Sequence, residues 1–400
     1  MKRIPLNAST FGDEETNAVL EVLRSTRVTM DVKCQEFERV FGEYLKGGEA
    51  IFVNSGSSAN LLGFFALANH AAPQPKNRRR FVHGSEVIVP AVSWSTTFWP
   101  IVQAGGVPVL VDSDPSTLQM KPEAMRAALS EKTVAVCPVH VLGNTVPMEE
   151  VMGFAEENRL WVIEDTCEAL GAHYDGKLAG TFGDMATFSF FFSHHITTIE
   201  GGMIVTRDAQ LAELLRCMRA HGWTRDLKNR QEKEALHPEI DPNFLFVNTG
   251  FNLRPTEINA VLGLIQLQKL DGFNQRRNEI ASLWTERFLP LIKQGTLYPM
   301  QPTACAGPAW FGYPVICHEP RIRKALKHHL DKHGVETRPI ICGNMARQPA
   351  IAHVNHRVSG NLSGADTIMD CGLMWGLHPL TSSDDVEYVA NTVLEFSPRL

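Results

Sequence analysis

The pattern that most restricts the fold is an alternation of short apolar stretches with helical patterns, which begins near residue 50. The apolar stretches are rich in β-branched residues and only a few residues long, as expected for strands that are buried on both faces. Helical spacing separates them, as in Leu61, Leu62 and Phe65. The alternation predicts an α/β fold with a mainly parallel sheet, with strands at residues 87–89, 107–111, 134–141 and 160–163. Functional groups of such sheets lie at the carboxyl ends of the strands.

A different pattern begins near residue 255. Pro255, Thr256 and Glu257 form a helix-start signal, and the apolar residues that follow predict a long helix. Short strands are expected beyond it, at residues 313–317 and 336–341, in a smaller α+β unit. The sequence therefore predicts a large domain at residues 1–255, and a linking helix with a small C-terminal domain at residues 256–400.

The composition restricts partners and location. The formal net charge of −6 gives no reason to expect nucleic acid or an anionic membrane as a partner. No apolar run approaches the ~20 residues needed to cross a bilayer, and the N-terminus lacks the apolar core of a signal peptide. The eight cysteines are scattered without a Cys-x-x-Cys pair, so no metal site is predicted. A reduced, cytoplasmic protein is the simplest interpretation.

Three features are expected where strands end. Residues 54–60, Asn-Ser-Gly-Ser-Ser-Ala-Asn, open a predicted helix whose N-terminal N–H groups attract an anion, although the same letters fit an ordinary capped turn. Asp165 ends an apolar strand, where it could cap a helix or pair with the ring nitrogen of a cofactor. Trp94 could stack on a flat ring or pack in the core.

The segment from Ser189 to Gly202 carries the most specific signal. It reads Ser-Phe-Phe-Phe-Ser-His-His-Ile-Thr-Thr-Ile-Glu-Gly-Gly, with histidines at positions 194 and 195. This frame resembles the DegT/DnrJ/EryC1/StrS family of vitamin B6-dependent sugar aminotransferases, in which a lysine at the position of His194 binds pyridoxal 5'-phosphate covalently. An imidazole cannot form that bond, but with a pKa near neutrality it can transfer protons.

Further segments extend the resemblance over nearly the whole chain, among them residues 90–97, 219–225 and 251–255. It implies an aspartate-aminotransferase-like fold, fold type I of the pyridoxal phosphate enzymes, in a homodimer with shared active sites. The cofactor, pyridoxal or pyridoxamine 5'-phosphate, would be bound non-covalently by Gly56, Ser57, Ser58, Trp94, Asp165, Glu168, Ser189 and Asn252. Substrate contacts are implied for Arg219, His221 and Arg254, and Asn252 and Arg254 would reach the neighbouring subunit's site.

The exchange of lysine for histidine implies dehydration in place of amino transfer. The branch of the family with this exchange removes the C3 hydroxyl of a nucleotide-linked 4-keto-6-deoxyhexose, and the pattern here is closest to the members that act on GDP-4-keto-6-deoxy-D-mannose. L-Glutamate would be the amino donor, ammonia would be released, and the product would serve 3,6-dideoxysugars of the colitose type in lipopolysaccharide O-antigens. His194 would be the catalytic base, with His195 as a structural neighbour.

Several alternatives compete with this interpretation. An ordinary sugar aminotransferase would need a lysine near position 194, and the loop from Ser189 to Gly202 contains none. A dehydratase for another nucleotide-linked 4-ketohexose would not need this lysine, so the sequence does not exclude it. A catalytically silent regulatory protein that binds the cofactor would not need both Asp165 and His194.

An iron–sulfur cluster is not expected. A related dehydratase that also replaces the lysine with histidine holds a [2Fe–2S] cluster on several cysteines soon after the catalytic loop. In this sequence only Cys217 lies between His195 and Cys305, so the corresponding ligands are missing.

Overall fold

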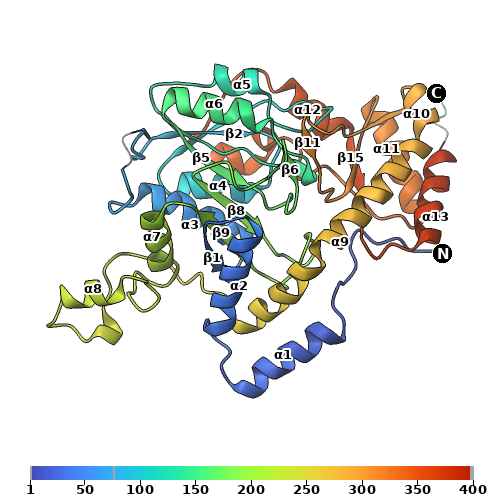
Figure 1. The fold of residues 1–400 in the computed structure, drawn as a ribbon. Helices are drawn as coiled ribbons and strands as arrows, with labels where there is room; N and C mark the ends of the chain where they lie inside the picture. The colour runs from blue at the N-terminus through green and yellow to red at the C-terminus, as the bar shows by residue number, and fades with distance from the viewer. Residues whose placement is uncertain (1, 75–76, 397–400) are drawn as a thin grey trace.

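The computed structural model describes all residues except 1, 75–76 and 397–400, and an eight-stranded sheet lies at its centre (Figure 1). Within the described residues every pairing in this sheet is parallel except the two that β9 makes with its neighbours. The strands, in spatial order, are β1 (Glu49–Val53), β9 (Gly202–Thr206), β8 (Met185–Ser189), β5 (Trp161–Asp165), β4 (Thr133–Val136), β2 (Glu86–Pro90), β3 (Val107–Val111) and β14 (Arg357–Val358).

Helices cover both faces of this sheet because successive strand residues point to opposite sides. Val87 and Val89 pack in a core cluster with residues of α3, α4 and α7, whereas Ile88 between them packs in another cluster with residues of α5 and α6. The helices of this part are α1 (Asp13–Ser25), α2 (Val32–Tyr44), α3 (Gly56–Ala68), α4 (Ser95–Gln103), α5 (Pro122–Ala127), α6 (Met148–Asn158), α7 (Ala209–Arg219) and α8 (Arg230–Ala235).

The predicted parallel α/β architecture is confirmed, and one strand differs in length. The strands predicted at residues 87–89, 107–111 and 160–163 coincide with β2, β3 and β5, but the stretch predicted at 134–141 is longer than β4, which ends at Val136. Pro138 lacks the N–H that would continue the ladder, although its carbonyl still accepts the N–H of Asp165 at 2.9 Å. The chain then turns away, with a left-handed backbone at Leu142 (φ 52°).

The long helix α9 (Glu257–Arg287) begins where the sequence predicts it and runs from α2 toward the smaller unit (Figure 1). Thr256 caps it: the Thr256 N–H donates to Asn259 Oδ1 at 3.1 Å, and the Asn259 N–H donates to Thr256 Oγ1 at 3.3 Å. This reciprocal pair satisfies two backbone groups and fixes the start of the helix.

The smaller unit is an antiparallel sheet with helices against it. Its strands are β10 (Leu297–Pro299), β12 (Tyr313–Cys317), β15 (Gly372–Trp375) and β13 (Thr337–Arg338), and its helices are α10 (Leu289–Lys293), α11 (Pro320–Lys332), α12 (Ser363–Cys371) and α13 (Ser383–Leu394). The predicted strand at residues 313–317 is β12, whereas only Thr337 and Arg338 of the stretch predicted at 336–341 pair as β13. A third, three-stranded sheet consists of β11 (Ala306–Gly307), β6 (His173–Tyr174) and β7 (Lys177–Leu178).

The chain passes between the two units more than once. Ile4, near the N-terminus, packs in the core of the smaller unit and forms a bridge with Val335, and β14, from the C-terminal part of the chain, pairs with β3. A division at residue 255 therefore stays a prediction about how the chain folds into units.

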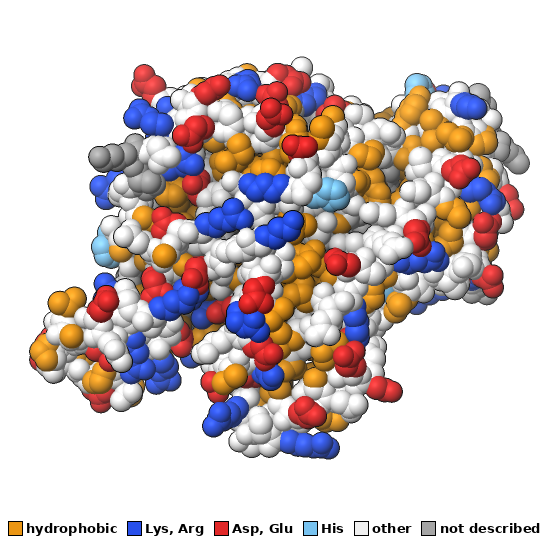
Figure 2. Space-filling view, viewed as in Figure 1, with side chains coloured by type: hydrophobic (Ala, Val, Ile, Leu, Met, Phe, Trp, Pro, Cys, Tyr) orange, Lys and Arg blue, Asp and Glu red, His pale blue; other side chains and the backbone are white. Residues whose placement is uncertain are grey.

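A segment around α8 projects from the body of the molecule (Figure 1). Figure 2 shows apolar side chains on this projection, and Leu236, Phe244 and Phe246 are 69%, 65% and 53% exposed. No helix in the described part of the chain has the length and apolar character needed to cross a membrane.

Candidate active site

A cavity of about 460 Å³ lies at the carboxyl ends of β5 and β8, beside the first turns of α3 and α4. Phe311, Arg338 and Met374 of the smaller unit close its other side. Most of the cofactor and catalytic residues predicted from the sequence line this cavity: Gly56, Ser57, Trp94, Asp165, Glu168, Ser189 and His194.

The loop before α3 has the geometry of an anion site. Ser55 caps the helix, with its Oγ accepting the N–H of Ser58 at 3.0 Å. The N–H groups of Gly56 and Ser57 belong to the first turn, where no helical carbonyl is in reach. Ser58 does not line the cavity, and its hydroxyl bonds to the Ser55 hydroxyl at 2.9 Å. Ser58 therefore helps to shape the loop, whereas Gly56 and Ser57 are available to an anion.

Two neighbouring elements complete this anion site. The Ser57 hydroxyl lies 3.0 Å from the Thr96 hydroxyl, so the first turns of α3 and α4 meet at the cavity. A Cβ on Gly56 would lie 2.5 Å from the Cβ of Ser189, so only glycine allows the loop to lie this close to the end of β8. Two helix N-termini and several hydroxyls in one place favour a phosphate group.

Asp165, at the end of β5, is held by three donors. Its Oδ2 accepts hydrogen bonds from Asn60 Nδ2 at 2.9 Å and Thr97 Oγ1 at 2.8 Å, and its Oδ1 accepts the N–H of Cys167 at 3.2 Å. The bond to Cys167 closes a local turn, and no helix begins at Asp165 in the described structure, so the helix cap that the sequence left open as an alternative does not form. The carboxylate nevertheless lines the cavity, and its fixed orientation suits a partner for a protonated ring nitrogen.

Glu168 lies three residues further along and also faces the cavity. Burial raises the pKa of its carboxyl group to about 7, and the negative charge of Asp165 adds to this effect, although a hydrogen bond from the Leu142 N–H opposes it. Glu168 can therefore hold a proton near neutral pH and donate a hydrogen bond.

The imidazole of His194 lines the cavity and packs edge-on against Phe311, with 5.0 Å between the ring centroids. Its Nδ1 is buried and has no hydrogen-bond partner in the described structure. Burial, reinforced by the positive charge of Arg277, lowers the pKa of His194 to about 3, below the near-neutral value expected from the sequence. The ring is therefore neutral, which is the form that accepts a proton.

His195 points elsewhere. It is 1% exposed, and its Nε2 lies 2.8 Å from the carbonyl oxygen of Ala309. Adjacent residues on an irregular loop face different directions, and here only His194 lines the cavity. The expectation that His195 is a structural neighbour agrees with this contact.

Trp94, at the start of α4, is 57% exposed beside the cavity. A large aromatic side chain left open to solvent at the entrance of a cavity is unusual for core packing. Of the two alternatives for Trp94, its position favours stacking on a bound ring.

Besides Ser58 and Arg219, three predicted residues lie outside the lining of this cavity: His221, Asn252 and Arg254. The Arg254 Nε donates to Asn252 Oδ1 at 3.0 Å, and Asn252 pairs with Ala220 in an isolated bridge. His221 and Asn252 are exposed to solvent. These side chains are therefore grouped, but they do not reach the cavity of their own chain.

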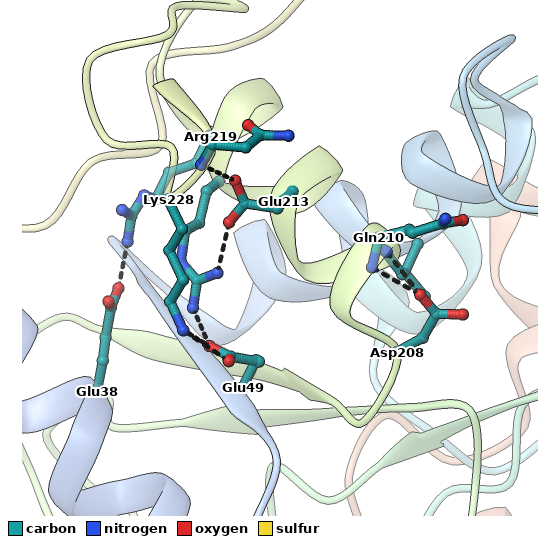
Figure 3. A network of polar contacts seen from close by, with 10 residues as sticks. Glu38, Glu49, Asp208, Gln210, Glu213, Arg219 and Lys228 are labelled. Atoms are coloured by element: carbon teal, nitrogen blue, oxygen red, sulfur yellow. Dashed lines mark hydrogen bonds and ion pairs between the residues drawn. The ribbon is translucent and has the colours of Figure 1, made fainter. Parts of the chain in front are cut away.

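The predicted substrate contact of Arg219 is not supported by the structure. The Arg219 side chain is 3% exposed, and it pairs with the carboxylate of Glu38 and donates to the Phe52 carbonyl at 2.8 Å (Figure 3). Phe52 lies in β1, and at the amino end of the same strand Glu49 bonds Lys228 at 2.6 Å. Arg219 therefore secures β1 against α2 and α7, because a buried guanidinium needs such partners.

Several cavity residues were not predicted from the sequence. Asn60 and Thr97 orient Asp165, and Phe311 and Arg338 come from the distant smaller unit. Asn60 follows the phosphate loop by one helical turn, so its spacing from Gly56 was the available signal. The contributions of Phe311 and Arg338 depend on tertiary packing.

The cavity fits the cofactor that the resemblance implies. Residues that favour a phosphate lie on one side, a carboxylate for a ring nitrogen lies on another, and an aromatic ring stands at the entrance. The buried Nδ1 of His194 lacks a protein partner. Within the described residues, no cluster of three or more His, Cys, Asp or Glu side chains could hold a metal ion.

Comparisons with known proteins agree with this geometry. The model of the DegT/DnrJ/EryC1/StrS aminotransferase family matches residues 9–394, so the chain belongs to this family, and its fold is the aminotransferase fold. The predicted family and fold are thereby confirmed.

Individual relatives are more specific. The chain is 36% identical over 397 residues to the GDP-4-keto-6-deoxy-D-mannose 3-dehydratase of Yersinia pseudotuberculosis, with 98% of each protein covered. It is similar to the E. coli GDP-4-keto-6-deoxy-D-mannose-3-dehydratase with bound hydrated PLP (34% identity, TM-score 0.90, 98% of this chain and 100% of the other). A GDP-4-keto-6-deoxymannose-3-dehydratase structure with a trapped PLP–glutamate geminal diamine matches at 34% identity and a TM-score of 0.89, with 98% and 100% of the chains covered.

The buried histidines predict how stability depends on pH. The folded-state pKa values of His194 and His195 are about 3, and that of His378 is about 4, against 6.5 for a free side chain. Between pH 5 and 6 the unfolded chain therefore binds more protons at these sites, so stability falls as the pH decreases from 7 to 5. Glu168 has the opposite effect on stability, because its raised pKa means that the folded chain binds more protons at this one site than the unfolded chain does. Thermal unfolding midpoints at several pH values test this.

The matched variant is His378→Gln, which removes one of the buried imidazoles away from the cavity lining. Its free energy of unfolding should depend less on pH than that of the unaltered protein, by about 1.4 kcal/mol per pH unit. Its unfolding midpoint should therefore also shift less with pH. A midpoint that is constant between pH 5 and 7 would contradict the assignment of neutral, buried histidines.

Proposed function

We propose that the protein is a pyridoxal phosphate-dependent 3-dehydratase of a nucleotide-linked 4-keto-6-deoxyhexose, with GDP-4-keto-6-deoxy-D-mannose as substrate. The observation that carries the proposal is His194 in a cavity whose other residues fit pyridoxal phosphate, at the position where aminotransferases of the family have lysine. The names of the most similar relatives support the same reaction and substrate.

Different residues of the cavity would have different roles in the reaction. Ser57, Ser189 and the first turns of α3 and α4 would bind the cofactor phosphate, and Asp165 would pair with the ring nitrogen. When bound, the cofactor would supply a protonated ring that takes up the electron pair left when a proton is removed from the carbon attached to it. His194, which is neutral in the structure, would accept a proton from the C4′ carbon of the cofactor as the C3 hydroxyl leaves the sugar.

L-Glutamate is the proposed amino donor, which would convert the cofactor to pyridoxamine phosphate before the sugar binds. The relative with a trapped PLP–glutamate geminal diamine supports this choice. Water would release the nitrogen as ammonia at the end of the cycle, and the 3-deoxy-4-keto sugar would serve a 3,6-dideoxysugar of the colitose type.

A homodimer with shared sites is part of the proposal. His221, Asn252 and Arg254 do not line the cavity of their own chain, although the resemblance assigns all three to an active site. The projection around α8, with Leu236 and Phe244 exposed, supplies an apolar surface for a second copy. In such a dimer Asn252 and Arg254 would complete the partner's site.

Product analysis tests the function directly. The protein, supplied with glutamate and a GDP-linked 4-keto-6-deoxyhexose, should release ammonia and a 3-deoxy-4-keto sugar. CDP- and dTDP-linked sugars serve as controls for the nucleotide and should react more slowly. A 4-amino sugar as the main product would identify an aminotransferase, and the absence of any product with cofactor bound would indicate a silent protein.

The absence of a lysine in the catalytic loop gives a second expected result. Borohydride treatment of the holoenzyme, followed by denaturation and mass spectrometry, should leave no pyridoxyl group on the chain, because His194 cannot bind the aldehyde covalently. His194→Lys is the positive control and should carry the adduct. An adduct on any active-site lysine of the unaltered protein would contradict the role of His194.

A further inference from the structure

A buried arginine without an acidic partner lies behind the catalytic loop. Arg277, in the middle of α9, is 2% exposed, and its Nη1 donates to the carbonyls of Leu377 at 2.9 Å, Phe311 at 3.0 Å and Trp310 at 3.4 Å. No carboxylate is among its hydrogen-bond partners in the described part of the chain. A buried charge is normally paired, so an unneutralised guanidinium at this place requires an explanation.

The positive charge of Arg277 contributes to the lowered pKa values of three histidine side chains. Burial lowers the pKa of Arg277 to about 10, so the side chain is still a cation at neutral pH. Its positive charge adds to burial in lowering the pKa of His194 and His195 to about 3 and that of His378 to about 4. All three rings are therefore neutral around a single cation.

Arg277 also reaches His194 through one packed residue. The carbonyl of Phe311 accepts the hydrogen bond from Arg277, and the N–H of Phe311 donates to the Leu142 carbonyl at 3.1 Å. The Phe311 ring then lies 5.0 Å from the His194 ring and 5.7 Å from the His195 ring. The backbone that carries this ring is thus held from both sides.

We propose that Arg277 is a positioning residue for His194: it fixes the Trp310–Phe311 backbone against which the imidazole packs. This inference rests on the proposed role of His194 as the base. The positive charge of Arg277 adds to burial in opposing protonation of that imidazole, and a carboxylate beside Arg277 would weaken this contribution.

Other ionisable groups line the same cavity as His194. His195 is adjacent on the loop, and the shared cavity contains Asp165, Cys167, Glu168, Glu200 and Arg338. The acidic groups among them attract a proton to His194, whereas Arg338 and Arg277 oppose it. Arg277 differs from Arg338 in being enclosed and bound only to carbonyls, so its charge is little screened by solvent.

Two substitutions separate charge from geometry. Arg277→Met removes the charge, and Arg277→Lys keeps it but lacks the planar fork. Arg323→Met is the matched control, because Arg323 also donates to a backbone carbonyl, that of Gly372 at 3.0 Å, but belongs to α11. The measurement is the nitrogen chemical shift of histidine rings in 15N-labelled holoenzyme between pH 5 and 8, with the His194 signal assigned by its loss in His194→Asn.

In Arg277→Met we expect the protonated fraction of His194 at pH 5 to rise about tenfold, a shift of one pH unit, while Arg277→Lys and Arg323→Met leave it unchanged. Arg277→Lys should lower kcat at least about fivefold with KM and cofactor occupancy unchanged, because the Phe311 backbone loses a donor. An unchanged His194 titration in Arg277→Met overturns the electrostatic part. Unchanged kcat in Arg277→Lys overturns the positioning part, and this test is available even when Arg277→Met does not fold. The titration of His194 is read without turnover, so it is independent of whether His194 is the base.

Discussion

Replacing His194 with asparagine is expected to leave the cofactor bound and to lower the rate of dehydration at least ~10²-fold, the lower range for the loss of a general base. Asparagine has roughly the size and polarity of imidazole and can remain against Phe311, but it cannot take up a proton. Ammonia release at saturating glutamate and nucleotide sugar measures the rate, and the absorbance of the bound cofactor measures occupancy.

Two matched variants accompany this experiment. His195→Asn and His221→Asn make the same exchange at a buried neighbour and at an exposed position outside the cavity. His195→Asn should retain far more activity than His194→Asn, because its ring does not line the cavity. His221→Asn, at a residue that the resemblance assigns to substrate contact, should raise KM more than it lowers kcat. Turnover near that of the unaltered protein in His194→Asn would assign the base to His195 or His221.

The second large effect concerns the proposed shared site. Arg254→Ala and His194→Asn should each be nearly inactive alone and should complement one another when co-expressed. An arginine gains most by pairing with phosphate, since its planar fork matches the phosphate oxygens, and Arg254 lies outside the cavity that contains its own chain's His194. A mixed dimer would therefore contain one site with both defects and one intact site.

Random mixing sets the size of the recovery. Half of the dimers are mixed, and one of the two sites in each is intact, so activity should recover to about a quarter of that of the unaltered protein. Differently tagged subunits allow the mixed dimers to be purified, and these should have about half the normal activity. Purified mixed dimers without activity would contradict the shared-site proposal.

The sequence was sufficient for β2, β3, β5 and the first part of β4, because these strands are buried and appear in the sequence as short apolar runs. The strands β1, β8, β9 and β14 were not predicted. The resemblance to the family placed Ser189 and His194 in one site with Asp165, and all three line the cavity. Asp165 and Ser189 end the strands β5 and β8, and of these two strands only β5 was predicted from its own apolar pattern.

What the sequence could not supply depends on contacts between distant segments. Arg219 has the residue type of an anion-binding side chain, and only its burial beside Glu38 assigns it a structural role. The pKa of His194 depends on its enclosure and on Arg277, which lies 83 positions away in the chain, a separation given by the two residue numbers. Neither effect has a local signature, because burial and long-range charge emerge only on folding.

The contact between Ala309 and the large unit limits how the enzyme can move. The Ala309 N–H donates to the Gly143 carbonyl at 2.9 Å, its own carbonyl lies 2.8 Å from His195 Nε2, and a Cβ on Gly143 (φ 88°) would lie 1.7 Å from that carbonyl oxygen. A hinge motion of the smaller unit would break these bonds and move the wall behind His194 at the same time. The segment that carries Ala309 and the catalytic loop are therefore one connected unit, and contacts within the chain hold the wall behind His194 in place.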